Sequence, residues 1–331
     1  QLMKKSLSLF LIALLTFACL MIPASAEKLG DTDASGEYTI SRPYQYELEP
    51  YSEEWYSITQ SSERVKLLQI PETVIKEMTT EALLLTLAKN PYIADVYAYN
   101  TIELGVDMTS SYVCGLKEFL ERDDSQSAVK KLSQSLNDGD STYERYIDNE
   151  TLRIRLDLLQ GIMGVLSVDS VNATSGYVTT PNGSSVPVIN NATYSYWGTT
   201  ISAVQQAQAS LLSSYPSATV VRSVSAATAA YNCHSYAWYS TASSNSAWMN
   251  SPVLYMTDGS YTQSTARVGS KIYWKQSNGT PIHSGILTSL GSPNVVTSKW
   301  GLCGVIRHNI DDSPYSNAAE YGSGISITAW N

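Results

Sequence analysis

A cysteine and a histidine in the second half of the chain have the residue types and settings of a nucleophile and its base. Cys233 lies where a stretch rich in Ser, Ala and Thr gives way to the aromatic run at residues 231–238. A thiol at the start of a helix ionises more easily, because unpaired backbone amides there carry partial positive charge. His283 lies fifty residues later, inside the apolar run at residues 281–287. The pair predicts nucleophilic cysteine chemistry at an acyl group.

Few bases are available for such a thiol, since the chain has three histidines. His234 is adjacent to Cys233, and neighbouring side chains diverge on a helix, so His234 is poorly placed to face the sulfur. His308 precedes a polar turn, which is typical of the end of a strand. His283 comes shortly after the turn residues 278–279, at the start of a predicted strand, and is therefore the favoured base.

Around these two residues the sequence resembles the NlpC-type papain-like hydrolases and their CHAP-type relatives. Residues 231–236 are similar to the family's aromatic-Asp-Cys-Ser-Gly signature, although Asn232 replaces the acid. Residues 268–274 resemble its Pro-Gly-Asp-apolar strand, and residues 283–287 resemble its His-Val-Gly-Ile-Tyr strand. The three matches occur in the family's order, cysteine before histidine, over about residues 200–310.

The resemblance implies a papain-like α+β domain that cleaves amide bonds of cell-wall peptide, with Cys233 as nucleophile and His283 as base. The backbone amide of Cys233 would supply part of the oxyanion hole. The family's third polar residue falls near Thr297 and Ser298, and Ser298 is the candidate that would orient the imidazole. No metal or organic cofactor is implied. Hydrolysis and acyl transfer would use the same residues up to the thioester.

Aromatic residues and one amide near these motifs are candidates for contacting substrate, because aromatic faces stack on sugar rings. The candidates are Tyr231, Asn232, Tyr236, Trp274 and Trp300. The same aromatic side chains are equally consistent with packing in a half-buried sheet. Two alternatives to the cell-wall amidase therefore remain open. One is a non-catalytic module that binds cell-wall glycan or peptide on the same scaffold, and the other is an acyltransferase or protease that acts on a protein substrate.

The cysteines and histidines of the second half do not have the spacing of a zinc site. Such a site would have to use Cys233, His234, Cys303 and His308. These residues include no paired Cys-x-x-Cys or His-x-x-x-His unit, so we expect no bound metal. After removal of a signal sequence three cysteines remain, and an odd number leaves one thiol unpaired. A bridge between Cys114 and Cys303 would leave Cys233 free, but the sequence does not establish that bridge.

Residues 1–26 have the three parts of a secretory signal. Residues 3–5 are basic at two positions, residues 7–22 are apolar, and residues 24–26 form a small-x-small cleavage site. The apolar part has about sixteen residues, fewer than the ~20 that a spanning helix needs. We therefore expect a secreted bacterial protein, extracellular or associated with the cell wall, without a stable membrane anchor.

Charge and composition predict three regions in the mature chain. They are an acidic helical accessory domain at 27–165, a strand or linker region at 166–198, and the papain-like domain at 199–331. Residues 27–165 carry 25 acidic and 13 basic side chains, whereas residues 166–331 carry 5 and 6. An acidic half gives no reason to expect nucleic acid as a partner, because binding it depends on basic side chains. Cell-wall peptide or a protein substrate is the expected partner, and the oligomeric state is left open.

Helical and strand patterns follow one another along the chain. Thr79 or Thr80 is predicted to cap a helix that ends at Asn90 and Pro91. Leucine and methionine recur at helical spacing over residues 152–166, which predicts an amphipathic helix. Short apolar runs divided by Gly, Pro and Asn follow in the second half. Helices first and antiparallel strands afterwards predict an α+β fold.

Overall fold

The computed structural model describes residues 30–32, 38–167, 174–322 and 324–331. The predicted signal sequence at 1–26 lies outside these residues. Within them the fold is α+β, with antiparallel sheets, as the order of sequence patterns predicts. None of the described helices is both long enough and apolar enough to cross a membrane.

Short helices make up most of the first half, after a small hairpin. The hairpin pairs β1 (Gly30–Thr32) with β2 (Tyr38–Ile40). The helices that follow are α2 (Glu53–Ser57), α3 (Ser61–Lys66), α4 (Glu72–Glu77), α5 (Thr80–Lys89), η1 (Pro91–Ala98), α6 (Ile102–Thr109), α7 (Leu116–Glu121), α8 (Ser125–Asn137) and α9 (Asn149–Leu166).

Local chemistry sets the ends of α5. The Thr79 side chain accepts a hydrogen bond from the amide of Ala82 and so caps the first turn, as one of the two predicted caps. Asn90 ends the helix in an extended conformation, as a residue before proline favours. Its side chain then caps η1, whose first residue is Pro91.

The second half holds two sheets and the helices that connect them. The helices are α10 (Ile201–Ser214), η2 (Ala226–Ala230), η3 (Ser235–Tyr239), α11 (Val253–Thr257) and α12 (Pro314–Tyr321). The strands are β3 (Thr174–Thr179), β4 (Ser185–Asn190), β5 (Thr219–Arg222), β6 (Ala247–Trp248), β7 (Lys271–Lys275), β8 (Pro281–Ser289), β9 (Val295–Lys299), β10 (Val305–Asn309) and β11 (Ser326–Trp330). The larger sheet has the order β11-β7-β8-β9-β10-β5 and the smaller one β3-β4-β6, with antiparallel pairing throughout.

Strand β8 lies inside the larger sheet, between β7 and β9, and carries His283. In the register of the sheet His283 lies opposite Trp274 of β7. Gly285, two residues on, allows β9 to approach closely, because a Cβ there would lie 2.4 Å from a methyl of Val296. The middle of β8 is buried, so its side chains are held in place by packing on both sides.

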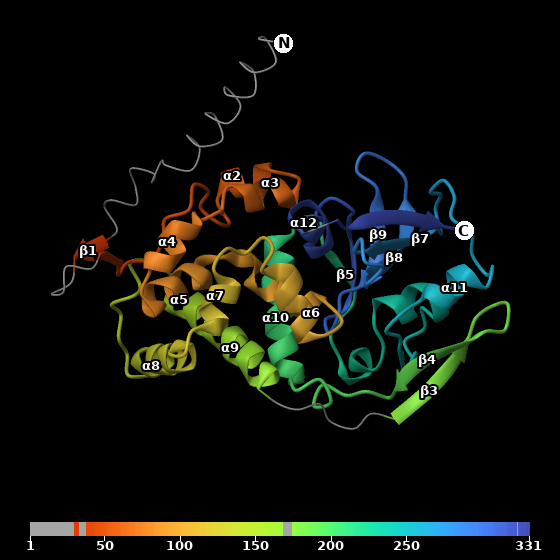
Figure 1. The fold of residues 1–331 in the computed structure, drawn as a ribbon, viewed down its shortest axis with the longest axis horizontal. Helices are drawn as coiled ribbons and strands as arrows, with labels where there is room; N and C mark the ends of the chain where they lie inside the picture. Colours follow the sequence, from red (N-terminus) through yellow and green to blue (C-terminus); the bar gives the residue numbers. More distant parts are fainter. Residues whose placement is uncertain (1–29, 33–37, 168–173, 323) are drawn as a thin grey trace, which may run out of the picture.

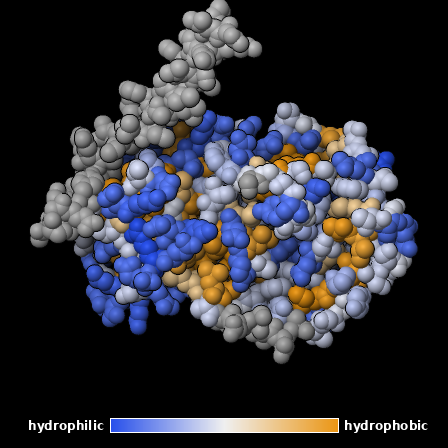
Figure 2. All heavy atoms as spheres, in the orientation of Figure 1, coloured by the Kyte–Doolittle hydropathy of each residue, from blue (hydrophilic) through white to orange (hydrophobic). Residues whose placement is uncertain are grey.

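One hydrophobic core runs through both halves of the described chain. Helix α10 packs against η1 and α9, and Figure 1 shows it between the other helices and the sheets. Tyr215, which follows α10, has its ring 5.4 Å from that of Tyr92 and 5.6 Å from that of Trp300. The predicted division near residues 165–199 therefore passes through shared packing, and the domain boundaries stay a prediction. On the face seen in Figure 2, hydrophilic side chains gather over the helical half.

Candidate functional site

Cys233 begins a helical turn at residues 233–234 that runs directly into η3, and Asn232 caps this turn. Residues 233–239 are called the cysteine helix below. The Oδ1 of Asn232 accepts hydrogen bonds from the amides of Ser235, at 3.1 Å, and Met249, at 3.2 Å. Its Nδ2 donates to the carbonyl of Met249 at 2.7 Å. The cap therefore also ties the start of the helix to the segment after β6. This position at a helix N-terminus is the one that the sequence predicts for the nucleophile.

The thiol of Cys233 is closed off from solvent, with 1% of the residue exposed. Its Sγ donates to Oδ1 of Asn100, from the first half of the chain, at 3.4 Å. Burial raises the pKa of the Cys233 thiol to about 12. Hydrogen bonding with the Ser284 backbone and with Asn100, and the charge of Lys299, oppose that rise. In this closed arrangement desolvation outweighs the helix terminus, and the sulfur is protonated at neutral pH.

His283 lies in β8, one residue before Ser284, whose backbone lowers the pKa of the Cys233 thiol. Its ring stacks on that of Tyr315, with centroids 3.4 Å apart and planes 9° apart. Neither ring nitrogen has a hydrogen-bond partner among the described residues, so no hydrogen bond joins the imidazole to Cys233. Burial holds the pKa of His283 well below its usual value, which keeps the imidazole neutral.

The other two histidines are engaged elsewhere. Nδ1 of His234 lies 2.8 Å from Oγ of Ser284, which also accepts from Nε1 of Trp238 at 2.9 Å. Nε2 of His308 lies 3.2 Å from Oγ of Ser298. Ser298, the predicted third residue, therefore contacts a different imidazole from that of His283. Its role in orienting the base stays a prediction.

The five residues predicted to contact substrate are packed inside the structure. Tyr231, Asn232, Tyr236, Trp274 and Trp300 are all buried. The hydroxyl of Tyr231 accepts from the guanidinium of Arg222 at 2.5 Å. These contacts agree with the alternative in which the aromatic residues pack in the sheet. Contact with substrate would require the site to open, so that role stays a prediction.

A segment of the first half covers the cysteine, and the sequence gives no sign of it. The amide of Leu302 donates to the carbonyl of Tyr97 at 3.1 Å, and the hydroxyl of Tyr315 donates to the carbonyl of Ala98 at 2.6 Å. Gly301 packs so closely that a Cβ there would lie 2.1 Å from the carbonyl oxygen of Tyr99. Residues 97–100, called the cover segment below, thus hold Asn100 over the thiol.

Lys299 is a further residue of the site that sequence patterns do not indicate. It is fully buried at the end of β9, and its Nζ donates to the carbonyl of Gly301 at 2.6 Å. Burial lowers the pKa of Lys299 to about 7. One sequence feature could have indicated that Lys299 is buried. It lies at the end of an apolar and β-branched run, directly before Trp300.

Metal binding and a disulfide are not found among the described residues. No group of three or more His, Cys, Asp or Glu side chains is placed there to hold a metal ion. Cys114 and Cys303 are both free thiols, so the bridge considered from the sequence is not formed. Cys114 donates to Oε1 of Gln69 at 3.0 Å, and Cys303 lies 3.8 Å from the carbonyl of Tyr97.

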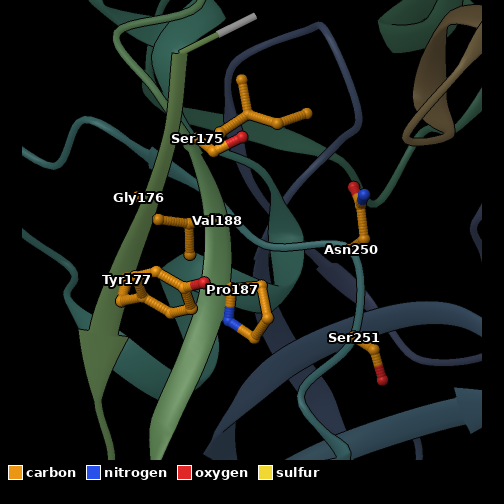
Figure 3. Close-up of a pocket in the computed structure, with 8 residues that line it drawn as sticks. Ser175, Gly176, Tyr177, Pro187, Val188, Asn250 and Ser251 are labelled. Atoms are coloured by element: carbon orange, nitrogen blue, oxygen red, sulfur yellow. The ribbon is translucent and has the colours of Figure 1, made fainter.

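A half-open hollow of about 370 Å³ lies on the surface between the β3–β4 hairpin and residues 250–251. Figure 3 shows Tyr177 and Pro187 side by side on the β3–β4 hairpin, with Asn250 and Ser251 on the facing segment. Tyr177 is 72% exposed and pairs with Pro187 across the hairpin. The facing segment directly follows Met249, whose backbone Asn232 holds. Hydrogen bonds between Asn232 and Met249 thus hold the residue before this facing segment next to the start of the cysteine helix.

No known family model, curated protein or solved structure matches the chain.

Proposed function

We propose that the protein is a secreted papain-like cysteine amidase or peptidase that cleaves amide bonds of cell-wall peptide. The observation that supports this most strongly is the placement of Cys233. It begins a helical segment that runs into η3, and η3 packs against β8, the strand that carries His283. A helix N-terminus stabilises a thiolate, and a neutral imidazole on the adjacent strand can accept its proton.

The reaction would proceed through a thioester. Cys233 passes its proton to a ring nitrogen of His283, both of which are unpartnered among the described residues. The sulfur attacks the amide carbon, and the backbone amide of Cys233 stabilises the oxyanion. His283 then protonates the leaving amine, the C–N bond breaks, and water deprotonated by His283 hydrolyses the thioester. An amine in place of water would complete acyl transfer.

The closed site adds a requirement to this mechanism. Substrate reaches the sulfur only after Asn100 and the rest of the cover segment move away, because the thiol is buried beneath them. Exposure to water also removes the desolvation that keeps the thiol protonated. The structure described here would therefore correspond to a latent form, and displacement of the cover segment would activate it.

The test is an assay of the mature protein on purified peptidoglycan and on casein. We expect release of new amino groups from peptidoglycan, abolished by Cys233→Ala and reduced by about 10²–10⁴ in His283→Ala, the range for loss of a general base. Cys114→Ala is the matched control, since its thiol bonds Gln69 instead. Undiminished activity of Cys233→Ala would contradict the proposed nucleophile. Cleavage of casein alone would move the substrate from cell-wall peptide to protein.

Glycan binding in the hollow of Figure 3 is a second candidate function. Its lining combines an exposed tyrosine ring and a proline ring with the amide of Asn250 and the hydroxyls of Ser175 and Ser251, and has no acidic or basic side chain. Such a surface suits a neutral sugar, which stacks one face on an aromatic ring and hydrogen-bonds at its edge.

Titration with chitotriose, followed by NMR, tests this candidate separately. We expect the signals of residues around Tyr177 to shift, and Tyr177→Ala to abolish the shifts. Tyr239→Ala is the matched control, because Tyr239 is an exposed tyrosine that is not among the residues lining the hollow. Binding that survives Tyr177→Ala would exclude the hollow as the site.

A further inference from the structure

Lys299 is a buried cation that the mechanism above does not use. Its ammonium has one hydrogen bond, to the carbonyl of Gly301, and lies 5.4 Å from the centroid of the Tyr231 ring. No carboxylate pairs with it among the described residues. Burying an uncompensated ammonium is costly. Burial therefore lowers the pKa of Lys299, and an anion that formed beside the amine would hold it in its charged form.

The cysteine helix forms one side of the Lys299 environment. Tyr231, whose ring lies near the ammonium, is two residues before Cys233 and leads directly into the helix. A cation near the face of an aromatic ring is attracted by its quadrupole, which holds Lys299 toward this segment. The start of the cysteine helix and the end of β9 are thus in contact through this pair.

The cover segment is also close to Lys299, through Gly301. Gly301 accepts from Lys299 and packs against the backbone of Tyr99. The next residue, Asn100, accepts from the Cys233 sulfur. The same two stretches of chain therefore flank the ammonium and the thiol, which places both groups in one enclosed environment.

Four ionisable groups face Lys299 in this environment. They are Cys233, Cys303, Arg222 and Tyr231. The two thiols raise the pKa of Lys299, and Arg222 lowers it. In the reverse direction, Lys299 lowers the pKa of Cys233 and of Cys303. Each thiol and the amine thus favour the charged form of the other, as expected for neighbouring acid and base groups.

We propose that Lys299 is a positioning residue whose positive charge holds Cys233 as a thiolate once the site opens to water. This inference rests on the proposed role of Cys233 as the nucleophile. The proton of the thiol leaves to His283 or to solvent. Opening to water also relieves the burial that lowers the pKa of Lys299, so its amine carries the positive charge when the thiolate forms. The role is electrostatic, so no bond forms between the nitrogen and the sulfur. Without the ammonium, no positively charged side chain among those that lower the pKa of Cys233 would remain, and only hydrogen bonds and the helix terminus would favour the thiolate.

The variant Lys299→Met tests the inference without any knowledge of the substrate. Replacing a buried charge by an apolar side chain of similar length is often neutral or stabilising, so the variant is expected to fold. The rate of iodoacetamide labelling at each cysteine is measured by mass spectrometry over roughly pH 6 to 10, where thiols titrate. Cys114, which bonds Gln69 away from Lys299, is the internal control.

We expect the labelling midpoint of Cys233 to rise by at least about one pH unit in Lys299→Met, which makes labelling about tenfold slower at neutral pH. The midpoint of Cys114 should not change. An unchanged Cys233 midpoint in folded Lys299→Met would overturn the inference. Lys299→Arg, which keeps the charge, should retain a midpoint near that of the wild type.

A second variant gives a reading if Lys299→Met fails to fold. Lys299→Gln also removes the charge but keeps a polar side chain at this position, so it should raise the labelling midpoint of Cys233 in the same way. An unchanged Cys233 midpoint in folded Lys299→Gln would overturn the inference. Loss of the proposed function is distinguished by activity: if Cys233→Ala still cleaved peptidoglycan, Cys233 would not be the nucleophile, whatever the two titrations show.

Discussion

Gly301→Ala should loosen the cover segment and expose Cys233. The backbone at Gly301 has φ +44°, in the left-handed region, where a residue with a Cβ costs roughly 1–2 kcal/mol. The added methyl would also lie 2.1 Å from the carbonyl oxygen of Tyr99, a contact with backbone that only a shift of the segment can relieve. Overpacking of this kind costs about 1–3 kcal/mol. We therefore expect the free energy of unfolding to fall by about 2–5 kcal/mol in total.

The two parts of that cost can be separated by a matched glycine. Gly183 also has a left-handed φ, of +90°, but a Cβ there would meet nothing within 4 Å. Gly183→Ala should therefore show only the backbone part, roughly 1–2 kcal/mol, in urea unfolding. The difference between the variants, about 1–3 kcal/mol, measures the contact with the cover segment.

The same difference predicts how fast the thiol is labelled. If labelling requires the cover segment to open, weakening its closure by about 1–3 kcal/mol should accelerate iodoacetamide labelling of Cys233 by about 5- to 150-fold. Cys114 in the same sample should be labelled at the wild-type rate. The reasoning would be refuted by a folded Gly301→Ala protein that has lost stability but labels Cys233 no faster than Gly183→Ala.

Two further predictions concern buried charge. Burial lowers the pKa of His234 to about 3 and that of His308 to about 4, whereas an unfolded histidine titrates near 6.5. Between these folded and unfolded pKa values, the unfolded state binds more protons than the folded state. The free energy of unfolding should therefore keep the whole contribution of the two neutral histidines above about pH 6.5 and decrease as the pH falls toward about 3. Urea unfolding should show a shallower decrease in His234→Gln, and equal slopes would contradict this. Arg64 pairs with Asp312 in the interior, so Arg64→Met should cost about 3–5 kcal/mol by leaving the carboxylate uncompensated. Adding Asp312→Leu should recover much of that loss, and a double variant no more stable than Arg64→Met would argue against the pair.

Local features of the fold were accessible from the sequence because they depend on neighbouring residues. The cap at Thr79 and the helix end at Asn90 follow from side-chain and proline chemistry within a few positions. The helix over residues 152–166 follows from the spacing of its apolar side chains. Cys233 at a helix start follows in the same way, from the change of composition around it.

The surroundings of the candidate site could not be predicted, because they depend on contacts between distant segments. Asn100 lies 133 residues before the thiol that it covers, and no periodic pattern connects the two. The stacking of Tyr315 on His283 depends on how α12 packs against helices of the first half, which brings its tyrosine to β8. Ser298 meets His308 because β9 pairs with β10, a register that neither strand specifies alone.

The central claim, that Cys233 attacks an amide with His283 as its base, is tested most directly by trapping the acyl-enzyme. The mature protein, as wild type and as Gly301→Ala, is incubated with cell-wall peptide, quenched in acid and mapped by mass spectrometry. We predict an acyl group on Cys233, more abundant in Gly301→Ala and absent from either background carrying His283→Ala. Cleavage of the peptide with the acyl group on another residue, or with undiminished rate in Cys233→Ala, would contradict the account.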